Sequence, residues 1–130
     1  MTRTLQIVTL LGLTALGSTA WAGYRYPFEV QIDLVNLTAK GALGSARASA
    51  DTNQAIGCRI GAGAGGSPTT YCFATNAAGT TVQCSTGDQA IAMVATAIRD
   101  SSLVSFSWNT QGTCLSLTAE NYSTNPPLEP

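Results

Sequence analysis

Residues 55–84, AIGCRIGAGAGGSPTTYCFATNAAGTTVQC, decide the fold, because they contain three short strand-like segments and three of the four cysteines. Asn76–Gly79 separates two of these segments. An Asn at the start and a Gly at the end of a four-residue turn favour a type I turn whose Gly takes positive φ. The sequence therefore predicts a hairpin between Tyr71–Thr75 and Thr80–Cys84, with a further strand at Ala55–Ile60.

The turn also sets the predicted register of this hairpin. If Asn76 faces Thr80, then Cys72 faces Cys84 and both thiols lie on one face of the ladder. This pair would belong to the hydrogen-bonded class, whose Cα atoms lie about 5.5 Å apart, against about 4.5 Å in the other class. The geometry therefore permits a disulfide between these two cysteines without requiring it.

The start of the chain has the features of a secretory signal peptide. A short basic leader precedes the apolar segment Leu5–Leu16, and Ala20-Trp21-Ala22 fits the small-x-small cleavage rule. The apolar segment is shorter than the roughly 20 residues that span a bilayer, which argues against a membrane anchor. We predict that residues 1–22 are removed, that no stable membrane span remains after cleavage, and that the protein is secreted or periplasmic.

Cleavage after residue 22 of the 130 leaves 108 residues, a length that suits one small domain. We expect a single disulfide-stabilised domain over residues 23–122 and an extended proline-rich tail over residues 123–130. The cysteines are widely spaced and the chain has no histidine. A zinc site is therefore not expected, and no cofactor is predicted.

Four cysteines in a small exported chain are typical of a disulfide framework. The candidate residues are Cys58, Cys72, Cys84 and Cys114. Three connectivities remain open. Pairing within the first hairpin would join residues 72 and 84, and then 58 and 114. Pairing across the first two strands would join residues 58 and 72, and then 84 and 114.

One main helix is predicted from Thr86 to about Arg99. Thr86-Gly87-Asp88-Gln89 has the pattern of a capping box, in which the third amide donates to the Thr hydroxyl and the Gln side chain reaches back. The apolar residues after it recur at helical spacing, which predicts one face packed on a sheet. They are Ile91, Val94, Ala95 and Ile98.

Three other segments complete the predicted fold. Phe28–Leu34 alternates apolar and polar residues with period two, which indicates a strand. Leu103–Trp108 and Thr113–Ala119 flank a second turn at Asn109–Gly112 and predict a second hairpin. Thr38–Asp51 is rich in Ala, Gly and Ser and fits either a short helix or an extended segment. The predicted class is α+β: a small antiparallel sheet of four to five strands, built from two hairpins, with one main helix packed on it.

The register of the second hairpin is less simple. The same turn rule places Trp108 opposite Cys114 and Phe106 opposite Ser116, which leaves Leu117 on the face opposite to Phe106. Either the register differs by one residue, or both faces of the sheet are partly covered. We favour covered faces, because the remaining apolar residues need burial.

The chain contains four short motifs in the order Ser45–Asp51, Ile56-Gly57-Cys58, Tyr71–Ala74 and Gly112-Thr113-Cys114. They span roughly residues 45–122, and together they resemble a family of small exported four-cysteine bacterial proteins. The resemblance implies bacterial export and the four-cysteine framework, and it implies no activity.

Charge and composition exclude several functions. Loss of Arg3 with the leader leaves five basic residues against seven acidic ones, a net charge of −2, so nucleic acid is not an expected partner. With no histidine, a hydrolase would need a carboxylate or lysine as its base, and Asp51, Asp88 and Asp100 fit structural roles. The glycine-rich run at 61–68 lacks the following helix that a phosphate cradle requires, and is therefore predicted to be a loop.

The sequence thus favours an exported, non-enzymatic binding or accessory module for an unknown protein or extracellular ligand. The first alternative is a structural subunit of a surface or envelope assembly, and the second is a small hydrolase. A binding module would be a monomer with its Gly61–Pro68 loop beside exposed aromatic residues. A subunit would show an unpaired strand edge, or an arm at Tyr24–Phe28 that pairs with a neighbour. The oligomeric state stays open between these two interpretations.

Overall fold

The computed structural model describes residues 26–125. The predicted signal peptide and its cleavage site lie outside the described residues, as do residues 126–130 of the predicted tail. The elements, in chain order, are β1 (Gln31–Asp33), β2 (Thr38–Ala42), α1 (Leu43–Arg47), β3 (Ala55–Gly61), β4 (Thr69–Thr75), β5 (Thr81–Thr86), α2 (Gln89–Thr96), β6 (Leu103–Trp108) and β7 (Cys114–Glu120).

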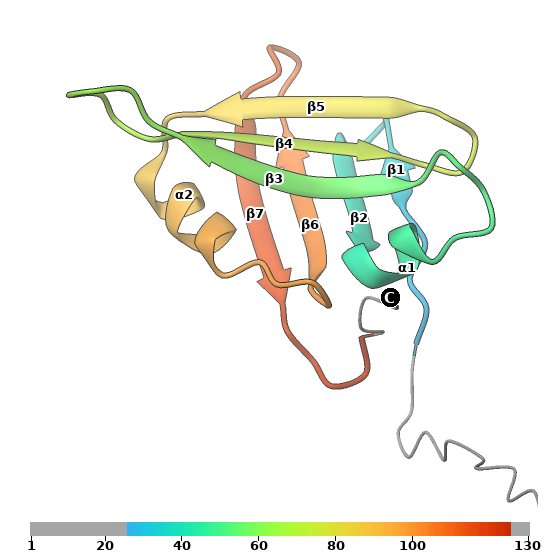
Figure 1. The fold of residues 1–130 in the computed structure, drawn as a ribbon. Coiled ribbons are helices and arrows are strands. Elements are labelled where there is room, and N and C mark those ends of the chain that lie inside the picture. The colour runs from blue at the N-terminus through green and yellow to red at the C-terminus, as the bar shows by residue number, and fades with distance from the viewer. Residues whose placement is uncertain (1–25, 126–130) are drawn as a thin grey trace, which may run out of the picture.

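The strands form two antiparallel sheets. One has the order β1-β2-β6-β7 and the other the order β3-β4-β5. The sheets lie face to face, and their strands run across each other (Figure 1). The α+β class with antiparallel strands is therefore confirmed, but the single sheet of four to five strands is wrong. Each hairpin is apolar on one face, and the two faces bury each other instead of sharing one sheet.

The two helices close opposite sides of the space between the sheets (Figure 1). α2 contacts β7 of one sheet and both β3 and β4 of the other, whereas α1 contacts β2 and β3. The predicted apolar face of α2 does point inward, because Ala95 is buried and Ile91, Val94 and Ile98 pack against the core. The expectation of one main helix is therefore incomplete, since α1 is a second, shorter one.

α2 begins later and ends earlier than predicted. Its N-cap is Asp88, whose carboxylate accepts hydrogen bonds from the amides of Ala90 at 2.8 Å and Ile91 at 3.0 Å. The Thr86 hydroxyl accepts only from the amide of Asp88, outside the helix. The predicted capping box is therefore wrong: the N-cap is Asp88, two residues after Thr86, because the Asp carboxylate is itself a strong N-cap group.

The first hairpin has the predicted turn and register. Gly79 has a φ of 81°, and the Thr80 amide donates to the side-chain oxygen of Asn76. Cys72 lies opposite Cys84, and the next inward pair is Ala74 and Val82. The local turn sequence therefore determined this part of the structure.

The second hairpin contains a β-bulge that the turn rule did not predict. Trp108 lies opposite Cys114 as expected, but Phe106 pairs with Leu117, because the register shifts between Ser107 and Trp108. The shift turns Leu117 into the core beside Phe106 and leaves Leu115 exposed. The favoured interpretation, with both faces of the sheet covered, is therefore wrong; the register differs by one residue instead.

The Ala-rich segment is both extended and helical. It forms β2 first and then α1, so each alternative holds for one part. Gly41 in β2 packs tightly on Val30, since a Cβ at position 41 would lie 3.0 Å from Val30 Cγ2. The strand predicted at Phe28–Leu34 is shorter, because Leu34 already belongs to a turn.

Candidate functional site

The four candidate cysteines form two disulfides, Cys58–Cys72 and Cys84–Cys114. This is the pairing across the first two strands. The Cα atoms of Cys58 and Cys72 lie 4.1 Å apart, a distance typical of the closer, non-hydrogen-bonded cross-strand pairs. Cys72 therefore bonds to its neighbour in β3 and not to Cys84, which faces it from β5. Two disulfides are typical of proteins from oxidising compartments.

The second disulfide ties the two sheets together. Cys84 belongs to β5 and Cys114 to β7, with Cα atoms 5.0 Å apart. Beside it, the amide of Ser85 donates to the carbonyl oxygen of Gly112 at 3.0 Å. Both disulfides are thus part of the framework, and none of the four cysteines lines the pocket described below.

Several carboxylates are engaged in local backbone structure. Asp51 accepts from the side-chain amide of Gln54 at 2.7 Å and from the backbone amides of Gln54 and Asn53, which together lower its pKa. Asp88 caps α2. In the described part of the chain, no three His, Cys, Asp or Glu residues are grouped so that they could hold a metal ion.

The glycine-rich run forms the loop between β3 and β4, so a strand follows it. A hollow of about 460 Å³ lies beside this loop, next to Arg59 and Tyr71. The guanidinium carbon of Arg59 lies 4.7 Å from the centre of the Tyr71 ring, and the Tyr71 hydroxyl bonds to Gln83. Because both the ring and the hydroxyl already have partners, this hollow is a weaker candidate than the following one.

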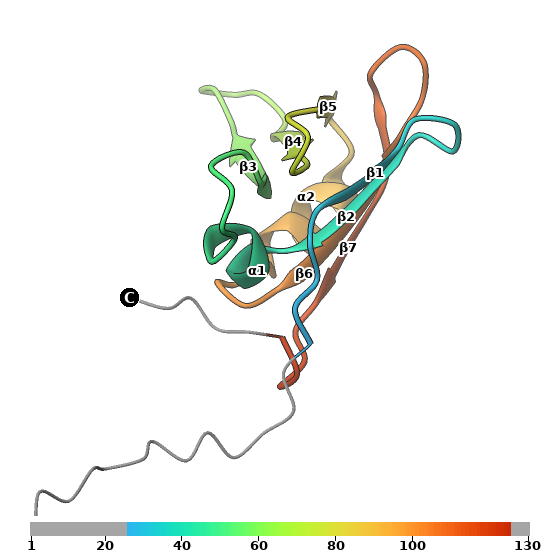
Figure 2. The same cartoon turned by 90° about the vertical axis from the view of Figure 1, so that its right-hand side faces the viewer.

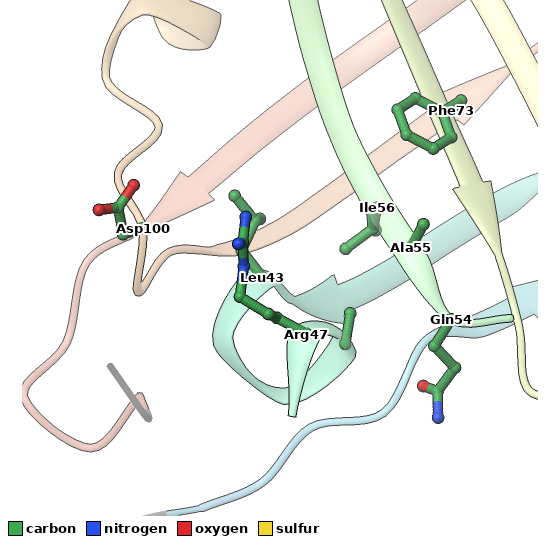
Figure 3. Close-up of a pocket in the computed structure, with 8 residues that line it drawn as sticks. Leu43, Arg47, Gln54, Ala55, Ile56, Phe73 and Asp100 are labelled. Atoms are coloured by element: carbon green, nitrogen blue, oxygen red, sulfur yellow. The ribbon is translucent and has the colours of Figure 1, made fainter. Parts of the chain in front are cut away.

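A pocket of about 290 Å³ opens between α1 and β3, an edge strand of its sheet (Figure 3). The lining residues come from four separate parts of the chain. They are Leu43, Ala46 and Arg47 of α1, Gln54, Ala55 and Ile56 around the start of β3, Phe73 of β4, and Asp100 after α2.

The pocket is lined by both apolar and charged side chains. Five of its lining side chains are Leu, Ile, Phe or Ala. The Gln54 amide is already committed, since its oxygen accepts from the Val30 amide at 2.8 Å and its nitrogen donates to Asp51. The two charged groups are Arg47 and Asp100, which lie toward one side of the pocket, with Phe73 toward the other (Figure 3). Such a site can hold an apolar group and orient a polar one beside it.

Sequence reasoning did not identify this pocket. The available signal was the run of small side chains, because Ala46 and Ala55 leave space between α1 and β3. Of the acidic residues weighed as catalytic groups, only Asp100 lies at the pocket.

No helix within residues 26–125 is long and apolar enough to span a membrane. Comparison of the chain with protein-family models, with curated proteins and with solved structures found no match. The resemblance to a family of exported four-cysteine proteins therefore stays a prediction, and the function has to be argued from the site itself.

Proposed function

We propose that the protein is an exported, non-enzymatic binding module, secreted or periplasmic, which holds an apolar group of a protein or extracellular ligand in the pocket between α1 and β3. The observation that carries this proposal is the open, largely apolar pocket of about 290 Å³, whose lining residues include one charge of each sign. An apolar cavity of about 150 Å³ accommodates a benzene-sized group, so this pocket has room for one or two aliphatic side chains.

The pocket favours binding over hydrolysis. Asp100 is the one carboxylate among its lining residues, and the other charged group is Arg47. Glycoside hydrolysis by the usual route needs two carboxylates on either side of the scissile bond. A nucleophile with an adjacent base is likewise missing from the lining residues, which include no Ser, Thr, Cys or Lys.

The proposal is tested by titrating the isotope-labelled mature protein with N-acetyl-leucinamide and following backbone amides by NMR. We expect saturable shifts at residues 46, 55 and 73, which line the pocket, because the leucine side chain displaces water from its apolar lining. N-acetyl-glycinamide, which lacks the side chain, is the control ligand and should produce no saturable shift. Equal responses to the two ligands would refute the proposed site.

A matched pair of variants separates the pocket from the rest of the surface. Ala55→Glu places a carboxylate at the pocket, and it should weaken leucinamide binding at least tenfold. Ala62→Glu introduces the same charge on the exposed glycine-rich loop, and it should leave binding unchanged. Export and cleavage are tested separately, by measuring the intact mass of the protein recovered from outside the cytoplasm. This mass should correspond to a chain that begins at Gly23.

A further inference from the structure

The turn between β1 and β2 carries two apolar side chains into solvent. Leu34 is 60% exposed and Val35 is 91% exposed. The turn itself is well ordered by Asp33, whose carboxylate accepts from the backbone amides of Val35 and Asn36, each at 2.9 Å. The same carboxylate accepts from the side-chain amide of Asn36 at 2.6 Å. We call Leu34 and Val35 the hairpin tip.

The far side of the turn is fixed to the core. Leu37 takes a φ of 52°, a conformation that is uncommon for residues other than glycine. Its side chain packs against the core, and its carbonyl oxygen accepts from the amide of Trp108 at 3.1 Å. A turn held in this way presents the two aliphatic side chains with little loss of conformational entropy on binding.

The hairpin tip and the pocket lie at opposite ends of β2. The tip comes directly before Thr38, the first residue of β2, and α1 begins directly after Ala42, the last residue. Figure 2 shows the turn and α1 separated by the length of the strand. One molecule therefore cannot place its own tip in its own pocket.

The tip and the pocket are complementary in chemistry. The tip offers two aliphatic side chains, and the apolar residues that line the pocket include Leu43, Ala46 and Ile56. One charge pair adds to this match. Asp33 directly precedes the tip, and Arg47 is among the residues that line the pocket. The Lys40 ammonium is not part of the match, because it lies 5.1 Å from the centre of the Phe28 ring, before β1. The Asp33 carboxylate and the Arg47 guanidinium can therefore attract each other when the tip enters.

We propose that the occupant of the pocket is the hairpin tip of a second copy of this chain. Because the two surfaces are different and lie at opposite ends of β2, the contact is heterologous and leads to head-to-tail chains or rings. This inference rests on the proposed binding function of the pocket. It also unites the two interpretations of the sequence, since a binding module whose partner is another copy is an assembly subunit.

A protein partner fits the tip better than a lipid surface. The β1–β2 hairpin, residues 31–42, contains no Trp or Phe, and Lys40 is its one basic residue. Binding to a membrane surface usually requires an apolar face together with a basic one. The contact is nevertheless small, well below the roughly 1,200 Å² of a stable interface, so we expect a Kd of about 0.1–1 mM.

The test uses sedimentation velocity of the mature protein from about 20 μM to about 1 mM, a range that brackets this Kd. Two variants remove one partner each. Leu34→Ser with Val35→Ser removes the tip and keeps the pocket, whereas Ala55→Glu blocks the pocket and keeps the tip. Leu115→Ser is the matched control, because Leu115 is also 60% exposed but lies in the bulge of β7.

We expect the tip variant and the pocket variant each to stay monomeric, with the Kd raised at least tenfold, and the control to associate like the wild type. An equimolar mixture of the two variants should form a one-to-one dimer and nothing larger, since it contains one intact tip and one intact pocket. With the tip variant isotope-labelled, the amide shifts on mixing should map to residues 46, 55 and 73.

Any of three results would overturn the head-to-tail contact: a wild type that stays monomeric to 1 mM, a mixture that does not dimerise, or a control that loses association equally. Tip-dependent binding to vesicles of phosphatidylcholine and phosphatidylglycerol by a monomeric protein would also overturn it. If leucinamide still binds the pocket in these cases, the proposed binding function stands and only its partner is wrong. If leucinamide does not bind either, both proposals fail.

Discussion

Two glycines in strands should respond in opposite directions to the same substitution. A Cβ at position 41 would lie 3.0 Å from Val30 Cγ2 and 3.1 Å from Val30 Cα, whereas a Cβ at position 57 would meet nothing within 4 Å. Neither glycine has positive φ, so alanine fits the backbone at both positions. We expect Gly41→Ala to destabilise the protein and Gly57→Ala to stabilise it.

The magnitudes follow from two opposing terms. Replacing a strand Gly by Ala gains about 0.4–1 kcal/mol, because the unfolded chain loses conformational freedom. Overpacking a core costs about 1–3 kcal/mol. Val30 cannot easily move away from position 41, since it is buried and its amide donates to Gln54. The net expectation is a loss of about 0.5–2 kcal/mol for Gly41→Ala and a gain of about 0.4–1 kcal/mol for Gly57→Ala.

Urea unfolding with intact disulfides, followed by tryptophan fluorescence, measures both effects. In the proposed mature chain, which begins at Gly23, Trp108 is the one tryptophan, and it is 8% exposed in the core. Its emission therefore reports loss of the packing between the sheets. A Gly41→Ala variant as stable as the wild type would mean that Val30 yields to the added methyl group, and it would refute the close approach of Val30 to position 41.

Two further predictions concern the disulfides and acid stability. Non-reducing peptide mapping should recover Cys58–Cys72 and Cys84–Cys114. Replacing Cys84 and Cys114 by alanines should lower the free energy of unfolding by about 3.5 kcal/mol, and replacing Cys58 and Cys72 should lower it by about 3 kcal/mol. The difference arises because the Cys84–Cys114 disulfide closes a loop with a sequence separation of 30 residues, against 14 for Cys58–Cys72. Four free thiols in the exported protein would contradict the disulfide framework. The pKa of Asp51 is lowered from its ordinary value of 3.8, chiefly by the hydrogen bond from the Gln54 side chain. The ionised Asp51 carboxylate therefore stabilises the folded protein fully above pH 3.8, and this stabilisation is lost as the pH falls through the lower pKa of the folded state. Unfolding measured between pH 6 and pH 2.5 should therefore show a smaller acid loss for Asp51→Asn than for the wild type, and identical pH profiles would count against this role.

Several features were determined by the sequence alone, because they depend on neighbours along the chain. The Asn76 and Gly79 turn sets the register of the first hairpin through the backbone conformations that these residues allow. The spacing of apolar residues in α2 defines its buried face for the same reason, since the helical period is local. The antiparallel α+β class followed from these elements together.

Other features were decided only by contacts between distant segments. Cys72 has a cysteine opposite it on either side, and its partner is Cys58, the pair that belongs to the closer class of cross-strand neighbours. The bulge in β7 depends on burying Leu117 against the other sheet, and the turn sequence carries no information about that sheet. Two sheets form because each sheet has to bury its apolar face, and here each buries it against the other. The sequence pattern shows which residues are apolar, but it does not show which element will pack against them.

The candidate site belongs wholly to this second group. Its lining residues run from Leu43 to Asp100 along the chain, and α1 and β3, which carry most of them, contact each other only in the folded chain. A pocket forms between α1 and β3 because the small side chains of Ala46 and Ala55 leave the space between these elements unfilled. The turns and the buried face of the helix were set by residues that are neighbours along the chain. Packing between distant segments decided which cysteines bond, where the register shifts in the second hairpin and where the pocket opens, because these features depend on distances that no local pattern encodes.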